Sequence, residues 1–132
     1  MSALNLILFT AESFRKDFDS VKKMTQVQGY NMNTIKGYVG EMLSSFIGEL
    51  SQRMPELPEA GFTQLDRLTR DHREKEWTRI SGGCQSLRKD ELTKVTTPEQ
   101  LDLLMDNIED YINQLKSMAY EVRYRVLTQN GF

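Results

Sequence analysis

Residues 97–128 carry the clearest structural signals in the chain and read TPEQLDLLMDNIEDYINQLKSMAYEVRYRVLT. Thr97 can cap a helix with its hydroxyl group, and Pro98 suits the first helical position because that position needs no amide donor. Gln100 can close a capping box by accepting a hydrogen bond from the backbone of the cap residue. We therefore expect a helix to begin at Pro98 and to run for about thirty residues, roughly 45 Å.

The apolar residues of this segment repeat at alternating steps of three and four, which is the a and d pattern of a heptad. A second apolar row follows at the e positions, so the apolar stripe is wider than the seam of a two-stranded coiled coil. The two rows are Leu101, Leu104, Ile108, Tyr111, Leu115, Met118 and Val122, and then Met105, Ile112, Ala119 and Val126. Such a helix needs more than one neighbour, and we expect it to be a core helix of a bundle.

The alternative is that part of this stripe stays exposed and binds another protein or a second copy of the chain. The residues of that predicted partner face are Tyr111, Leu115, Met118 and Val122.

Length and charge narrow the class of protein. The chain has 132 residues, a length that predicts one domain with one core. A domain of this size needs no disulfide or metal to fold. It has 17 basic and 19 acidic residues, a balance that argues against a general electrostatic grip on nucleic acid. A single cysteine and the absence of a signal-peptide pattern predict a reducing, cytoplasmic location. No apolar run is long enough to predict membrane insertion.

The N-terminal residues 2–28 show the same three-four spacing and predict a second long helix. Its apolar row is Leu4, Ile7, Ala11, Phe14, Phe18, Val21 and Thr25. A competing interpretation makes residues 3–9 a buried strand, because periodicity alone cannot classify a short apolar run. Residues 29–33 then contain a glycine that can stop a helix and an asparagine that can cap the next one, which predicts a tight reversal.

The middle of the chain predicts further helices separated by breaks. Residues 34–54 form a helical pattern in which Gly40, Ser44 and Gly48 lie four apart, a spacing that favours close packing of a neighbouring backbone or, as the alternative, a groove for a ligand. Residues 54–61 contain two prolines and a glycine, and they predict the main loop or hinge.

Residues 62–80 predict a mostly solvated helix, which we expect to end at the Ser81-Gly82-Gly83 sequence. Residues 84–95 predict one more short helix. The predicted fold is therefore all-α: a single domain over residues 1–132, built as a bundle of four to five helices with long heptad helices at both ends.

Few residues could carry catalysis. His72 is the only histidine, and the residue three positions before it is Thr69, so the Glu-x-x-His pairs of helical metal sites are absent. Cys84 and His72 form the only candidate pair for nucleophilic catalysis, and a lone cysteine is more often a small buried apolar residue. We therefore expect no catalytic site, no metal and no cofactor.

Basic residues concentrate in one segment. Eight of the 17 lie between Arg67 and Lys94, but five acids lie there too, and the segment reads more simply as a solvated face. If it instead binds nucleic acid or another anionic partner, basic groups would contact phosphates and Trp77 could stack on a base. The residues of this possible anion-binding patch are Arg67, Arg70, Arg73, Lys75, Trp77, Arg79, Arg88 and Lys89.

Together these patterns predict a small cytoplasmic interaction protein, an adaptor, chaperone-like protein or regulator that acts through protein–protein contacts. We expect a homo-oligomer, with a dimer favoured, because two long heptad helices in a small domain imply apolar surface that one chain does not cover. A nucleic-acid-binding regulator that uses residues 67–94 is the alternative.

Overall fold

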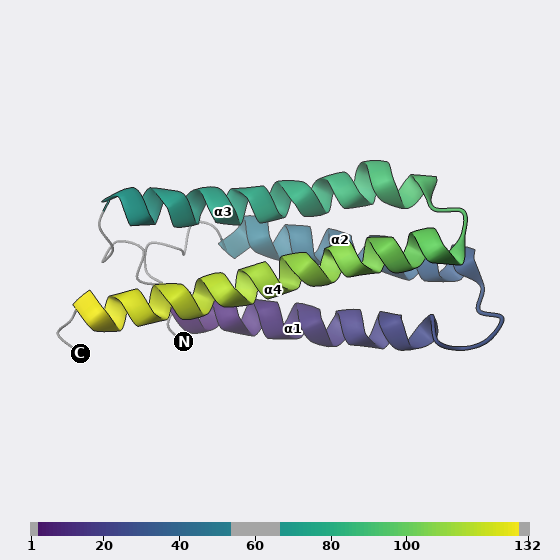
Figure 1. Ribbon diagram of the computed structural model, residues 1–132, viewed down its shortest axis with the longest axis horizontal. Coiled ribbons are helices and arrows are strands. Elements are labelled where there is room, and N and C mark those ends of the chain that lie inside the picture. The colour runs from purple at the N-terminus through teal and green to yellow at the C-terminus, as the bar shows by residue number, and fades with distance from the viewer. Residues whose placement is uncertain (1–2, 54–66, 130–132) are drawn as a thin grey trace.

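A computed structural model of the chain describes residues 3–53 and 67–129 (Figure 1). These residues form four long helices: α1 (Ala3–Met24), α2 (Met32–Arg53), α3 (Arg67–Ser86) and α4 (Pro98–Gln129). A π-helical turn (Leu87–Glu91) and a 3-10 turn (Leu92–Lys94) continue α3 toward α4. The described residues contain no strand, so the prediction of an all-α bundle is confirmed with four helices.

Consecutive helices run in opposite directions along one long axis, so the bundle has an up-down-up-down arrangement (Figure 1). The first helix packs against α2 and α4, and α3 packs against the same two helices on the opposite side. The last turns of α4 extend beyond the N-terminal end of α1 (Figure 1). Each helix therefore faces two neighbours, which is why α4 needs an apolar stripe wider than a coiled-coil seam.

One continuous apolar core runs through the bundle. The rings of Phe14 and Phe46 stack in parallel with their centroids 3.6 Å apart, which joins α1 to α2. Trp77 of α3 is buried, and its indole nitrogen donates a hydrogen bond to the Leu50 carbonyl oxygen at 3.1 Å. On α4 the buried residues are Leu101, Leu104, Met105, Ile108, Ile112, Leu115, Met118 and Ala119. Full burial of such side chains contributes about 1.5–3 kcal/mol each, so this stripe holds the bundle together.

The capping box at the start of α4 is confirmed. The Gln100 amide donates a hydrogen bond to the Thr97 hydroxyl oxygen at 3.2 Å, and the Thr97 amide donates to the Gln100 side-chain oxygen at 3.2 Å. Nearby, the Lys36 ammonium group donates to the Val95 carbonyl oxygen at 2.7 Å. These bonds fix the connection that leads into α4.

The N-terminal segment is helical from Ala3, so the interpretation of residues 3–9 as a strand is wrong. The helix ends at Met24, four residues earlier than predicted, and the chain then turns back through Gly29, which has a φ of 76°. Asn31 caps α2 as predicted, because its side-chain oxygen accepts a hydrogen bond from the Thr34 amide at 3.1 Å. The structure therefore contains the predicted tight reversal between α1 and α2.

Two predictions based on glycine are wrong. The Gly82-Gly83 pair does not end a helix, because α3 continues to Ser86, and residues 84–95 extend that helix rather than forming a separate one. Gly48 has open space where a Cβ atom would lie, and Gly40 approaches only a side-chain atom of Leu92, so neither lets a neighbouring backbone approach. The predicted hinge at 54–61 lies outside the described residues.

Candidate functional site

The predicted partner face on α4 belongs mostly to the core. Leu115 and Met118 are buried within the single chain, so the expectation that these two residues contact a partner is wrong for this fold. Tyr111 is partly buried, and its ring lies against Gly83 of α3. The Val122 side chain lies outside the described residues. Over the described residues, the apolar stripe of α4 is covered by α1 and α3.

Trp77, the predicted stacking residue of the possible anion-binding patch, is not at the surface. Trp77 is buried and its indole nitrogen is bonded to the Leu50 carbonyl oxygen, so the prediction that it stacks on a base is wrong. The exposed members of the patch are Lys75, Arg79, Arg88 and Lys89. The side chains of Arg67, Arg70 and Arg73 lie outside the described residues. What the structure describes is four exposed basic residues, two on α3 and two in the π-helical turn that follows it.

Cys84 lies fully buried in the core, and burial raises the pKa of its thiol from 9.0 to about 12. A neutral, inaccessible thiol is a poor nucleophile, and the expectation of a small buried apolar residue is confirmed. The His72 side chain lies outside the described residues. Over residues whose side chains are described, no group of three or more His, Cys, Asp or Glu is placed to hold a metal ion.

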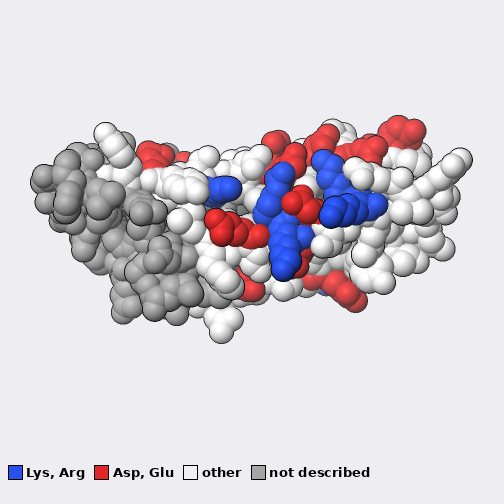
Figure 2. Space-filling view, turned by 90° about the horizontal axis from the view of Figure 1, so that it is seen from below, with Lys and Arg blue, Asp and Glu red and all other residues white. Residues whose placement is uncertain are grey.

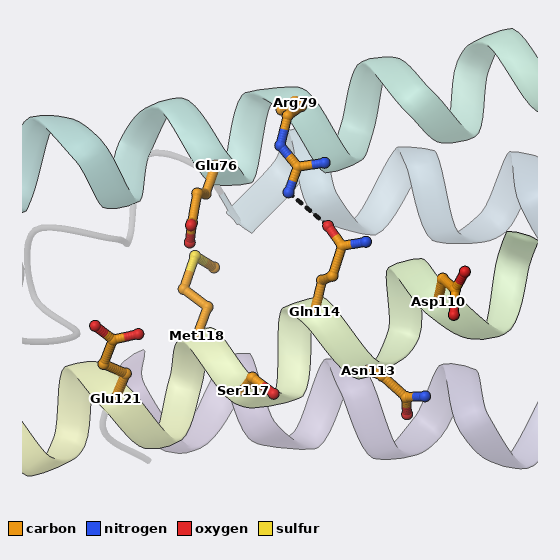
Figure 3. A pocket seen from close by; sticks show the side chains of 8 residues that line it. All are labelled: Glu76, Arg79, Asp110, Asn113, Gln114, Ser117, Met118 and Glu121. Carbon is orange, nitrogen blue, oxygen red and sulfur yellow. Dashed lines mark hydrogen bonds between the residues drawn. The ribbon is translucent and has the colours of Figure 1, made fainter.

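A polar groove of about 320 Å³ lies between α3 and α4 (Figure 3). Its residues are Glu76, Arg79, Asp110, Asn113, Gln114, Ser117, Met118 and Glu121. The Arg79 guanidinium crosses the groove and donates a hydrogen bond to the Gln114 side-chain oxygen, which ties α3 to α4. Carboxylates stand at both ends, with Glu76 and Glu121 at one end and Asp110 at the other (Figure 3). The groove can hold polar or cationic groups at the surface.

Sequence reasoning missed this groove, although the sequence contains a signal for it. Gln114 and Glu121 are seven residues apart, on the polar row next to the d positions of the α4 stripe. A polar row that borders an apolar stripe marks the edge where two helices meet the solvent.

The outer face of α4 is the most distinctive surface that the structure describes. We define it by residues on the side of α4 opposite the core, all of them exposed: Glu99, Asp102, Leu103, Asp106, Asp110, Asn113, Lys116, Ser117, Tyr120 and Tyr124. Three of its members are large and largely apolar, and their exposed fractions are 63% for Leu103, 48% for Tyr120 and 71% for Tyr124. These residues lie outside the a, d and e rows, so the heptad pattern did not predict them as a surface feature.

The face that carries α1 has a different character. Figure 2 shows basic and acidic side chains interspersed in the middle of this face, without a broad region of one sign. The Arg15 guanidinium contacts Asp19 at 3.5 Å within α1 and Glu109 of α4 at 3.0 Å. These exposed pairs contribute little stability, typically about 0–1 kcal/mol. Mixed charge of this kind favours solvation over a contact with a strongly charged partner.

Comparisons of the chain with protein-family models, with curated proteins and with solved structures found no match. Among the described helices, none is both long enough and apolar enough to cross a membrane.

Proposed function

We propose that this chain is a small cytoplasmic protein-interaction module, an adaptor, chaperone-like protein or regulator, and that the outer face of α4 is its contact surface. One observation supports the proposal above the others. Leu103, Tyr120 and Tyr124 are all exposed on the outer side of the longest helix, with Leu103 toward its N-terminal end and the two tyrosines toward its C-terminal end. Tyrosine is enriched at protein interfaces because it offers a large amphipathic contact area and loses little conformational entropy.

Leu103, Tyr120 and Tyr124 are not part of the buried core. The a, d and e rows of α4 already fill the contacts with α1 and α3, and Leu103, Tyr120 and Tyr124 lie outside those rows. An exposed side chain contributes little to the free energy of unfolding, since that contribution scales with the apolar area removed from water. A partner that covers Leu103 and the two tyrosines would supply this missing burial.

The chemistry of the described residues favours binding over catalysis. The one thiol is buried in the core, and the α3–α4 groove is polar and open to solvent. A helical surface of charged residues with a few aromatic residues is suited to contact another protein, where apolar anchors provide affinity and charges provide specificity.

Affinity capture from the native extract tests the proposal when it compares matched variants. We expect the wild-type chain to recover a protein that Leu103→Ser and Tyr124→Ser both lose. Tyr38→Ser is the control, because Tyr38 is 45% exposed on α2, away from the proposed surface, and should retain the partner. Loss of the partner in all three variants, or in none, would place the contact elsewhere.

A low-salt gel shift with mixed DNA and RNA separates this proposal from nucleic-acid binding. We expect no shift. A shift that weakens steeply as salt rises, and that disappears when Arg88 and Lys89 are both changed to alanine, would instead favour phosphate contacts by the basic segment.

A further inference from the structure

Charge changes sign along α4. Its first half, residues 98–113, contains five acids and no base, whereas its second half, residues 114–129, contains three bases and one acid. The exposed acids of the outer face are Glu99, Asp102, Asp106 and Asp110, and Lys116 is the first base to follow them. The outer face is therefore acidic toward the N-terminal end of the helix and loses that character past its middle.

The apolar side chains of the outer face are also placed about the middle of α4. Leu103 lies ten residues before Asn113, and Tyr124 lies eleven residues after it. When two identical helices pair in antiparallel directions with their midpoints aligned, a residue before the midpoint meets one equally far beyond it. Leu103 then lies opposite position 123, within one residue of Tyr124 of the second copy, and Asp110 lies opposite its Lys116.

We infer that the outer face of α4 binds the same face of a second copy of this chain, with the two α4 helices antiparallel about a two-fold axis near Asn113. This inference rests on the proposed function and names its partner. The arrangement is isologous, so every contact occurs twice. A parallel pairing would place acid against acid along the first half of the helix, and like charges in direct contact are unfavourable.

The structure leaves room for this contact. The residues at its centre, Asn113 and Ser117, are exposed and line the open α3–α4 groove, so none of the described helices covers the proposed axis (Figure 3). Tyr124 is largely exposed to solvent. The interface is narrow and partly polar, which predicts a reversible dimer that dissociates on dilution and weakens as salt screens the charges.

Charge exchange tests the pairing of Asp110 with Lys116. Sedimentation equilibrium at low salt should show dimerisation of the wild-type chain, and Lys116→Glu or Asp110→Lys alone should each weaken it by at least about tenfold. The double variant Asp110→Lys, Lys116→Glu restores opposite charges across the interface, so its dissociation constant should return to within about threefold of wild type. These two residues are six apart and do not face each other within one helix.

Cysteine cross-linking tests the direction of the helices. Asn113→Cys should form an intermolecular disulfide under mild oxidation, because position 113 lies at the axis. Glu99→Cys should not, because the two copies of position 99 lie about 40 Å apart in the antiparallel arrangement. The native Cys84 is buried and does not compete in the folded protein.

Each outcome decides the inference. A chain that stays monomeric at several hundred micromolar, a dimer that tolerates the single charge reversals, or equal cross-linking at positions 99 and 113 would overturn it. The proposed function has a separate readout. Suppose that the chain is monomeric, still captures a protein partner, and fails to capture it when Tyr124 is changed to serine. That result would refute the dimer but support the proposal that the chain is an interaction module.

Discussion

Gly83 offers the sharpest test of how α3 and α4 fit together. It lies inside α3, and the ring of Tyr111 from α4 packs directly against it. A Cβ atom added at this position would lie 2.8 Å from Cε1 of Tyr111 and closer still to Cζ and Oη. Real Cβ atoms essentially never lie closer than 3.0 Å to such an atom. Gly83→Ala must therefore displace the tyrosine ring, although alanine is the better helix former.

The neighbouring glycine provides the matched control. Gly82 has no atom within 4 Å of the place where a Cβ atom would lie, so Gly82→Ala should gain the full helix-propensity term of about 1 kcal/mol. Gly83→Ala should gain the same term and lose about 1–3 kcal/mol to overpacking. The free energy of unfolding of the two variants should therefore differ by about 1–3 kcal/mol, with Gly83→Ala the less stable.

Urea melts of both variants, repeated with Tyr111→Ala, measure the clash directly. Without the tyrosine ring, Gly83→Ala should become stabilising by about 1 kcal/mol, so that the two glycine positions behave alike. If Gly83→Ala stabilises the wild-type chain as much as Gly82→Ala does, the contact between α3 and Tyr111 is not formed as described, and the reasoning fails.

Five further substitutions test the core, the thiol and the helix cap. Ile108→Ala and Leu115→Ala should each lower the free energy of unfolding by about 2–5 kcal/mol in urea melts, because both residues are fully buried, whereas the exposed Asp106→Ala should change it by no more than about 0.5 kcal/mol. Burial raises the pKa of the Cys84 thiol from 9.0 to about 12, so the folded state holds this proton more tightly than the unfolded state does. The resulting stability is fully present below pH 9 and is lost as pH rises toward 12. Above pH 9 the free energy of unfolding of Cys84→Ala should therefore fall less steeply with pH than that of wild type, and the two slopes should differ by up to about 1.4 kcal/mol per pH unit. Thr97→Ala should cost about 0.5–2 kcal/mol through loss of the capping box, and an unchanged melting curve would show that the cap does not support α4.

The sequence predicted helix ends correctly where residues close together in the chain determine them. The start of α4 depends on Thr97, Pro98 and Gln100, which lie within four residues of one another, so the sequence alone was sufficient. The N-terminal run at residues 3–9 was harder to assign, because a seven-residue run that is apolar except for Asn5 fits a strand or a helix equally well. Packing against α2 and α4 resolves it, and that contact depends on residues far along the chain.

The helix α3 continues through Gly82-Gly83, although the low helix propensity of glycine predicts a break there. Each glycine costs about 1 kcal/mol relative to alanine, which favours a break. The buried residues Trp77, Ile80, Cys84 and Leu87 nevertheless continue at steps of three and four across the pair. Burial of that apolar row outweighs the cost of the glycines, and Gly83 also gives Tyr111 the space that it needs.

The contact surface was harder to predict than the fold. Periodicity identifies which side of a helix is apolar, and a long apolar stripe reads the same whether a neighbour in the chain or a partner covers it. Only the arrangement of α1 and α3 shows that Leu115 and Met118 are covered within one chain. Leu103 and Tyr124 become distinctive once those contacts are filled.

The helix macrodipole does not explain the charge pattern of α4. Acids near an N-terminus are favoured by the dipole, but that effect fades within the first turn. Glu99 lies in the first turn of α4, whereas Asp106 and Asp110 lie two and three turns further on. Intrachain pairing does not explain them either, because Asp106 and Asp110 are four apart in one helix, where like charges are mildly destabilising. A basic group that meets this half of the helix would offset that repulsion, and in the antiparallel arrangement Lys116 of the second copy lies beside Asp110.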